Sequence, residues 1–405
     1  MKILLLVLCV YFLFYSLYWL FLTIFGLPEG KSKSRIGNPT NPELLLVLPA
    51  YKPGKIFYQV LDSVSVAIRG RNINVIVLFQ ECDDQELIAY AKASNFFVEE
   101  KSFANEKGNT YQCALKYISQ LISQGRKRNI CQPEFVMLVD KDNLLSPDFF
   151  NSIPQGFYDR FDIIQGKRKA IQSTGAIALF DTISELLNDM MFRRAKFRMG
   201  GMIEISGSGS LIETDLFVQT INKLDPKAPG FDKNFMVNLL TSKREVRTIY
   251  WPDSILLEEK TSEINSYNPQ RVRWFGEQYY NAVYHAKSLV GAFLKQKRFA
   301  ALDYWITLCR PPRSIHVMTA PFFAMIELGW FAYAGEWYFA IPVLTISFVV
   351  MMFSVLIFLS SEKLLSRALM NSFKLPLLAW NNLFNAVTSI RRENQGKFIH
   401  TTHKL

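Results

Sequence analysis

The chain has 405 residues, of which 50% are hydrophobic and 20% are charged, and its formal net charge is +11. The high apolar fraction excludes an intrinsically disordered protein, and the five cysteines are too sparse for a small disulfide-stapled domain. The basic excess forms no stripe with interleaved aromatic residues, so we expect no nucleic-acid partner. We attribute part of the charge to contact with anionic membrane lipids.

Three segments are long and apolar enough to cross a membrane. Residues 3–27 and 337–361 contain no charged residue, and residues 315–334 contain only Glu327. The first run is too long for the apolar core of a cleaved signal peptide, so we expect a retained anchor. The other two are predicted to be antiparallel spans joined by a very short turn. Because an ionisable group at this depth is costly in lipid, Glu327 should face a cavity or a partner and not lipid.

Basic residues follow the first segment, precede the second and follow the third. They are Lys31, Lys33, Arg35, Arg310, Arg313, Lys363 and Arg367. The positive-inside rule then predicts a multi-pass protein of the plasma or inner membrane, with its N-terminus outside. The large polar middle of the chain is predicted to lie in the cytosol.

Residues 279–309 and 373–390 are predicted to be amphipathic helices that lie on the cytosolic face of the membrane. The second stretch is apolar but contains Asn381, Asn382 and Asn385, which would be costly inside a bilayer. A fourth span in this stretch is the alternative.

Short apolar runs alternate with helical patterns through residues 38–275. The runs are 44–48, 75–79, 135–139, 162–165 and 247–250, and the helical patterns include 56–68 and 112–123. This alternation predicts an α/β domain with a parallel sheet that is covered on both faces. Ligands of such sheets bind beyond the carboxyl ends of the strands, so the polar residues there are the candidate site residues.

Asp140 and Asp142 follow the third apolar run at positions i and i+2. Two carboxylates in this arrangement can share a hard divalent cation that also binds a diphosphate. A turn that caps a helix is the alternative. Lys167 and Arg168, after the fourth run, are interpreted as a solvated basic turn, with phosphate contacts as the alternative.

Gln270, Arg273 and Trp274 share one face of a predicted helix, which suits the recognition of a phosphate and a sugar together. An interfacial helix with snorkelling arginines is the alternative. The small residues of 206–210 would allow the backbone to approach a ligand closely, and a flexible turn is the alternative.

In this order the motifs resemble those of the membrane-embedded, processive-type family-2 glycosyltransferases, which include the cellulose, chitin and hyaluronan synthases. The resemblance covers residues 40–361, and Gln-x-x-Arg-Trp is its most specific part. It implies a Rossmann-like α/β GT-A fold in the cytosol and an all-α membrane part. It also implies an inverting transferase that uses a nucleotide-diphospho-sugar donor and Mg²⁺ or Mn²⁺.

The resemblance implies roles for individual residues. Asp140 and Asp142 would hold the metal, and Asp232 would be the general base. The donor would bind to Pro49, Tyr51, Gln80, Asp84, Lys107, Asp140 and Arg273. The acceptor would bind to Gly207, Ser208, Gly209, Gln270 and Trp274. Gln80 replaces the family's base-binding Asp, and Phe231 replaces a Glu. These two replacements leave the identity of the donor's nucleotide base undetermined.

The sequence therefore predicts a hexosyltransferase that extends a polysaccharide at the cytosolic membrane face. A single-addition enzyme acting on a membrane lipid and a catalytically inactive membrane scaffold are the alternatives. A narrow channel of three spans would be completed by a homo-oligomer or an accessory export protein. The expected parts are an anchor with a basic flank (1–37), the GT-A domain (38–275), interface helices (276–313), two spans (314–361), and an interfacial helix with a cytosolic tail (362–405).

Overall fold

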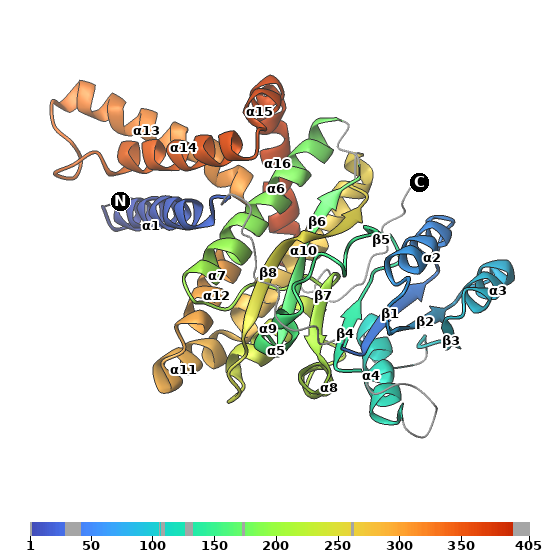
Figure 1. Cartoon of the computed structure of the whole chain (residues 1–405). Helices are drawn as coiled ribbons and strands as arrows, with labels where there is room; N and C mark the ends of the chain where they lie inside the picture. Colours follow the sequence, from blue (N-terminus) through green and yellow to red (C-terminus); the bar gives the residue numbers. More distant parts are fainter. Residues whose placement is uncertain are drawn as a thin grey trace.

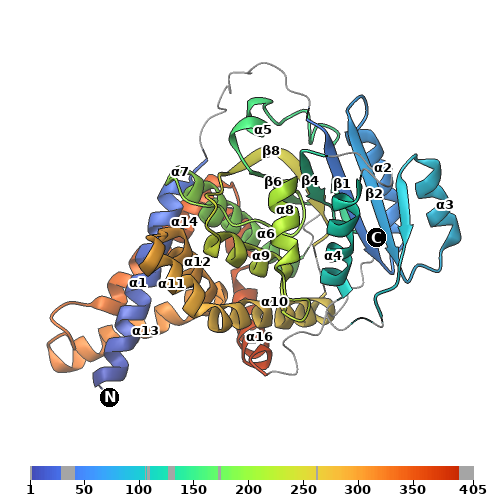
Figure 2. The same cartoon turned by 90° about the horizontal axis from the view of Figure 1, so that it is seen from below.

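A computed structural model describes residues 2–28, 42–104, 106, 110–125, 133–171, 175–260 and 263–391. An α/β domain lies beside a group of long apolar helices (Figure 1), and a view from below shows the same separation (Figure 2). The N-terminus lies at the far end of the apolar group.

Within the described residues, the sheet has eight strands in the order β3-β2-β1-β4-β7-β6-β8-β5. They are β1 (Leu44–Tyr51), β2 (Ile73–Gln80), β3 (Phe97–Glu100), β4 (Phe135–Leu138), β5 (Asn143–Leu145), β6 (Ile163–Ala170), β7 (Ser210–Glu213) and β8 (Thr248–Glu258). The five strands predicted from the apolar runs are all present.

The sheet is mixed, so the expectation of a parallel sheet is wrong for part of it. Strand β1 pairs in parallel with β2 and β4, and β2 pairs in parallel with β3. Strand β7 is antiparallel to both β4 and β6, and β5 is antiparallel to β8. Strands β5 and β7 are only three and four residues long. Segments this short contain no apolar run from which a strand could be predicted.

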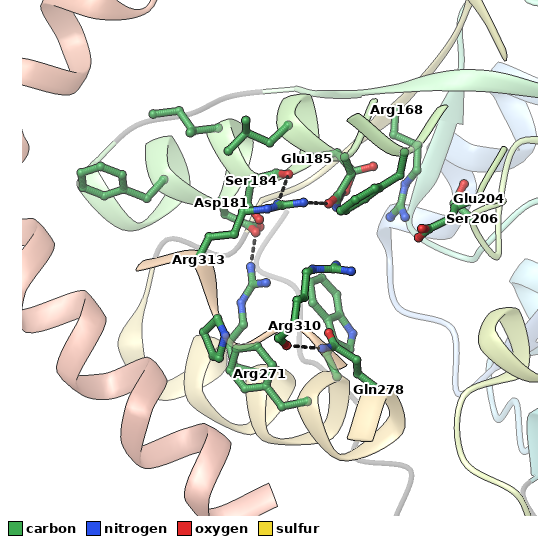
Figure 3. A pocket seen from close by; sticks show the side chains of 18 of the residues that line it. Arg168, Asp181, Ser184, Glu185, Glu204, Ser206, Arg271, Gln278, Arg310 and Arg313 are labelled. Carbon is green, nitrogen blue, oxygen red and sulfur yellow. Dashed lines mark hydrogen bonds and ion pairs between the residues drawn. The ribbon is translucent and has the colours of Figure 1, made fainter. Parts of the chain in front are cut away.

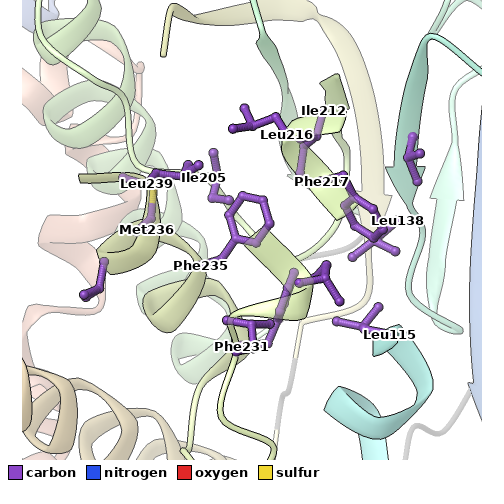
Figure 4. Packing of buried hydrophobic residues seen from close by; sticks show 14 of the residues in the cluster. Leu115, Leu138, Ile205, Ile212, Leu216, Phe217, Phe231, Phe235, Met236 and Leu239 are labelled. Carbon is purple, nitrogen blue, oxygen red and sulfur yellow. The ribbon is translucent and has the colours of Figure 1, made fainter. Parts of the chain in front are cut away.

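Helices cover both faces of the sheet. One face packs against α4 (Thr110–Ser123), α8 (Thr214–Asn222) and α9 (Phe231–Thr241), as Figure 4 shows for Leu115, Phe217 and Phe235. The other face packs against α2 (Ile56–Ala67) and α3 (Gln85–Ala93). Residues of β1 alternate between the two clusters, and all of its leucines are buried. Burial on both sides explains the uninterrupted apolar run of this strand.

The remaining helices form the walls around the end of the sheet and the apolar group. They are α5 (Gly156–Arg160), α6 (Ala176–Asn188), the π-helix η2 (Asp189–Ala195), α7 (Lys196–Arg198), α10 (Ile264–Tyr284), α11 (Ala286–Gln296), α12 (Phe299–Cys309), α15 (Leu365–Met370), the 3₁₀ turn η3 (Ser372–Lys374) and α16 (Leu375–Ser389).

Among the described residues, three helices are long and apolar enough to cross a membrane, as the sequence predicted: α1 (Lys2–Gly26), α13 (Arg313–Ala334) and α14 (Val343–Ser361). Helix α14 begins after Pro342, so residues 335–342 form the connection to α13. The prediction of a very short turn is therefore wrong, because the aromatic residues after Gly335 belong to the connection and not to the span.

The C-terminal end of α1 is held against the α/β domain. A Cβ atom on Gly26 would lie 2.3 Å from the carbonyl oxygen of Met190 in η2, so only glycine fits here. Arg194 donates a hydrogen bond to the carbonyl oxygen of Gly26 at 2.9 Å, and Arg198 donates to that of Phe25 at 2.9 Å. These arginines satisfy carbonyl groups that the end of a helix leaves unpaired and complement its dipole.

Helix α16 turns its amides inward and its apolar side chains outward. Asn382 accepts a hydrogen bond from Tyr267 at 3.1 Å and donates one to Ser314 at 2.9 Å. Asn385 donates to Asn268 at 3.0 Å, whereas Trp380 is 67% exposed. Helix α16 has only 15 residues and is not among the three candidate spans. This arrangement favours the interfacial helix over a fourth span.

Glu327 is buried within α13 and has a specific partner. Its two carboxylate oxygens accept hydrogen bonds from the backbone N–H groups of Leu344 at 3.2 Å and Thr345 at 2.7 Å. Glu327 thus caps the N-terminus of α14, where the helix dipole also favours a negative charge. The expectation that this carboxylate faces a partner is confirmed.

We predict that Glu327→Ala destabilises the helix pair by about 1–3 kcal/mol, because two buried N–H groups lose their acceptor. Thermal unfolding of the purified protein in detergent measures the effect. Glu336→Ala is the matched control, since Glu336 is exposed in the connection between the same helices. Equal melting temperatures for the two variants would contradict the capping role.

Candidate active site

A cavity of about 670 Å³ lies where the ends of β1, β4 and β6 face α6, α9 and α10. Predicted site residues that line it are Pro49, Tyr51, Asp140, Asp142, Gly207, Asp232, Arg273 and Trp274. They come from segments spread over more than half of the chain.

Tyr111 of α4 marks the convergence of three of these residues, which we call the carboxylate cluster (Asp140, Asp142 and Asp232). Its hydroxyl donates a hydrogen bond to Oδ1 of Asp140 at 3.3 Å. Burial, followed by the charges of Asp140, Asp232 and Asp142, raises the pKa of Tyr111 well above its ordinary value. All three carboxylates therefore lie close enough to influence this partly buried hydroxyl.

Asp140 and Asp142 have the chemistry of a two-carboxylate metal site. Burial, and then the neighbouring Asp142, raises the pKa of Asp140 to about 6, since two negative charges repel each other in a poorly hydrated space. A divalent cation would relieve this repulsion. No cluster of three or more metal-ligating side chains occurs among the described residues. A metal on this pair would thus need further oxygens, such as those of a diphosphate, in the way that Mg²⁺ is usually bound.

The loop at residues 206–210 supports Asp140. The backbone N–H of Asp140 donates to Oγ of Ser208 at 3.1 Å, and Gln165 accepts from the backbone N–H of Ser206 at 2.8 Å. Ser208 is fully buried and, like Gly209, is absent from the cavity lining, whereas Gly207 lines it. The loop is therefore a fixed support and not a flexible turn. Acceptor contact by Ser208 and Gly209 stays a prediction without geometric support.

Asp232 lies in the first turn of α9, after Gly230 with its positive φ of +77°. The ammonium of Lys233 lies 3.4 Å from Oδ1 of Asp232 and 3.5 Å from Oε2 of Glu277. Burial opposes the charge on Lys233, but these two carboxylates leave its pKa raised overall. Glu277 in turn lies 3.5 Å from Arg273. A chain of alternating charges thus links Asp232 to the Gln-x-x-Arg-Trp segment.

Arg271, which the sequence analysis did not single out, fixes helix α10. It forms a buried ion pair with Asp181 of α6, and its guanidinium lies 4.5 Å from the ring centroid of Trp274. A second ring, that of Tyr267, lies 4.7 Å away on the same helix. Arg271 therefore orients Trp274, while Gln270 does not line the cavity.

Two predicted donor-binding residues lie outside the cavity lining. Asp84 caps α3, since its Oδ1 accepts from the backbone N–H of Leu87 at 2.9 Å. Gln80 is 2% exposed at the end of β2, and its Oε1 has no hydrogen-bond partner among the described residues. Lys107 lies outside the described residues. Donor binding by these three residues stays a prediction.

Arg168 is not part of a solvated turn, because strand β6 extends to Ala170 and carries it into the cavity wall. There it forms an ion pair with Glu258 of β8. The strand continues past the apolar run because its last residues pair with β8. Lys233 and Glu277 are thus site residues that no motif indicated, whereas Arg168 was already the alternative candidate for phosphate contacts.

The family model described as "Glycosyltransferase like family 2" matches residues 42–277 of the chain. The chain belongs to this family. The match spans the sheet, the carboxylate cluster and the first two thirds of α10. The chain is therefore a family-2 glycosyltransferase, as its motifs implied, although the match does not distinguish the synthase type.

One solved structure shares the fold of this glycosyltransferase, and two others show a weaker likeness. The mannosyltransferase PcManGT from Pyrobaculum calidifontis, in complex with GDP-Man and Mn²⁺, is 11% identical with a TM-score of 0.52, and the match covers 94% of this chain and 93% of that one. TarS 1–349 from S. aureus is 14% identical (TM-score 0.41, covering 88% and 93%). Glucosyl-3-phosphoglycerate synthase from Mycobacterium tuberculosis is 13% identical (TM-score 0.38, covering 64% and 86%). A comparison with curated proteins gave no match.

The α/β domain is accordingly a GT-A domain with a helical C-terminal part, which confirms the expected fold class. The likeness to PcManGT extends along nearly the whole of both chains. It thus includes the helices that follow the family match as well as the domain itself.

We predict that Asp181→Asn destabilises the enzyme by about 3–5 kcal/mol, because Arg271 would keep a buried charge without its carboxylate. Chemical unfolding measures the loss, and Asp159→Asn, at an exposed position on α5, is the control. Adding Arg271→Met to Asp181→Asn should recover part of the stability. A change below about 0.5 kcal/mol, which is ordinary for a surface residue, would show that the ion pair does not hold α10 in place.

Proposed function

We propose that this glycosyltransferase transfers a sugar, with inversion, from a nucleotide-diphospho-sugar to a membrane lipid at the cytosolic face of the membrane. The observation that carries the proposal is the continuity of one cavity. It contains the carboxylate cluster and is also lined by residues of α13, α14, α15 and α16. Donor chemistry and an apolar acceptor can therefore meet in one space.

The two carboxylates Asp140 and Asp142, together with Arg273, support the assignment of the donor site. A divalent cation on Asp140 and Asp142 would bind the diphosphate and stabilise the charge that develops as it leaves. Arg273 lines the same cavity and offers a planar set of donors that suits phosphate oxygens. PcManGT, which shares the fold, contains GDP-Man and Mn²⁺, and this also favours a nucleotide-sugar donor with Mn²⁺ or Mg²⁺.

Inversion requires a single displacement. The acceptor hydroxyl would give its proton to Asp232 while its oxygen forms a bond to the anomeric carbon of the donor sugar. The bond from that carbon to the diphosphate would break on the opposite side. One base suffices for this reaction, whereas retention by double displacement would also need a nucleophile. Trp274 lines the cavity and offers an aromatic face to a sugar ring.

The cavity walls favour a lipid acceptor over a growing polysaccharide. Beyond the carboxylate cluster, the lining includes Val317, Met352, Val355 and Leu359. These side chains offer sugar hydroxyls no hydrogen-bond partner, but they suit an acyl or prenyl chain. Polysaccharide synthesis, the first expectation from the sequence, has no comparable support in the cavity.

The proposed orientation follows from the basic residues and from the docking of α1. The end of α1 that contacts the α/β domain is its C-terminal end. Lys363 and Arg367, after α14, and the arginines before α13 lie at helix ends that the positive-inside rule assigns to the cytosol. The catalytic domain would then lie in the cytosol and the N-terminus outside.

We predict that Asp232→Asn lowers the rate of sugar transfer by about 10²–10⁴-fold, because the acceptor hydroxyl loses its general base. Release of nucleoside diphosphate and formation of labelled product are measured in parallel. Asp215→Asn, at an exposed position on α8, is the control. Unchanged transfer by a folded Asp232→Asn protein would refute this assignment. A single glycolipid product supports the proposal, and a ladder of polymer lengths contradicts it.

We predict that a chelator abolishes transfer and that Mn²⁺ or Mg²⁺ restores it. Asp142→Asn should require a higher metal concentration for the same rate, because one of the two anionic ligands is lost. The metal dependence of the rate is measured for both proteins at fixed donor concentration. Full activity in the presence of chelator would exclude a metal-assisted reaction.

A further inference from the structure

The cavity changes character along its length. One part of the lining contains the carboxylate cluster, and another part comes from α13 to α16 and is mostly apolar. Residues 310–312 link α12 to α13. Arg310 and Arg313 stand on either side of two prolines in this link, and both line the cavity.

Both guanidinium groups gather around one aromatic ring. The guanidinium carbon of Arg310 lies 4.5 Å from the ring centroid of Phe192, and that of Arg313 lies 5.1 Å from it. Phe192 belongs to the π-helix η2, a type of insertion that occurs often at functional sites. Figure 3 shows Arg271, Arg310 and Arg313 in the space between helix α6 and helix α10.

Other arginines in the cavity wall are neutralised by carboxylates. The pairs are Arg168 with Glu258, Arg193 with Glu185 and Asp189, and Arg271 with Asp181. Burial of these charges is therefore compensated within the protein.

Arg310 and Arg313 differ from them, because neither forms an ion pair within the part of the chain that the structure describes. Arg310 donates to the carbonyl oxygen of Thr307 at 2.8 Å. Arg313 donates to the carbonyl oxygen of Ser184 at 3.3 Å and to Oδ1 of Asn188 at 2.8 Å, and its Nε is buried without a partner. Two positive charges next to apolar walls, with only neutral acceptors, leave room for an anion.

We propose that Arg310 and Arg313 bind the phosphate of an anionic lipid acceptor. The apolar tail of this lipid lies along α13 and α14, and its hydroxyl-bearing headgroup reaches Asp232. This inference rests on the proposed function and specifies the acceptor. In the reaction, the headgroup oxygen bonds to the anomeric carbon, the nucleoside diphosphate leaves, and the hydroxyl proton passes to Asp232.

The donor diphosphate is the competing anion for these arginines. The two cases predict different kinetics. If the arginines bind the acceptor, their loss raises the KM for lipid and leaves the affinity for nucleoside diphosphate unchanged. If they bind the donor, nucleotide affinity falls as well.

The test uses the full-length enzyme and phosphatidylcholine vesicles that contain either phosphatidylglycerol or diacylglycerol. Both added lipids carry a free hydroxyl, but only the first has an anionic phosphate. We expect transfer to phosphatidylglycerol, and we expect Arg310→Gln and Arg313→Gln to raise its KM about tenfold or more. Arg310→Lys and Arg313→Lys should raise this KM by a smaller factor, because lysine keeps the positive charge. Arg160→Gln, on the exposed end of α5, is the control.

Each outcome decides the proposal. Equal use of diacylglycerol, with no effect of the arginine variants, overturns the phosphate site and leaves lipid glycosylation standing. Weaker nucleotide binding by the variants overturns it in favour of the donor. If inorganic phosphate at equal concentration protects the enzyme from thermal unfolding as well as phosphatidylglycerol does, in an arginine-dependent manner, the site takes free phosphate and the lipid assignment is overturned. Polymer formation without any glycolipid refutes the proposed function itself.

Discussion

The site depends on the buried ion pair between Arg271 of α10 and Asp181 of α6. Helix α10 carries Arg273 and Trp274, whereas α6 continues into η2, against which α1 packs through Gly26. The pair therefore joins the part of the cavity lined by Arg273 and Trp274 to the elements that hold α1. Separating the two helices would leave a charge in a poorly hydrated space, which costs several kcal/mol. For this reason the cavity between them has a defined shape before any ligand enters it.

The sequence predicted those parts of the fold whose pattern is local. Strands β1, β2 and β4 appear as apolar runs because both of their faces are covered, and α1, α13 and α14 appear because they are long and apolar. Strand β3 was missed because two of its four residues are glutamates, and the short β5 and β7 depend on partners distant in sequence. The start of α14 was misplaced because aromatic residues in the preceding connection are as apolar as the helix itself.

Within the site, the sequence indicated Asp140, Asp142 and Asp232, because acidic residues in motifs at strand and helix ends are recognisable. Lys233 and Glu277 were not recognisable, since they meet only in space and lie 44 residues apart. Asp84 is the opposite case, because the sequence indicated it as a donor-binding residue but it lies outside the cavity lining. An aspartate just before a helix is a common N-cap, and that local role accounts for it without any ligand.

Two buried polar residues of the apolar helices have partners inside the protein, and the arginines of the cavity can be compared with this pattern. Glu327 and Asn382 look costly in sequence, but each bonds to a specific partner inside the protein, so the exposed faces of their helices stay apolar. Arg193 and Arg271 follow the same pattern through carboxylates. Arg310 and Arg313 satisfy hydrogen bonds but not charge within the described chain. The anionic lipid proposed above would supply this compensation, and its tail would suit the apolar walls of the same cavity.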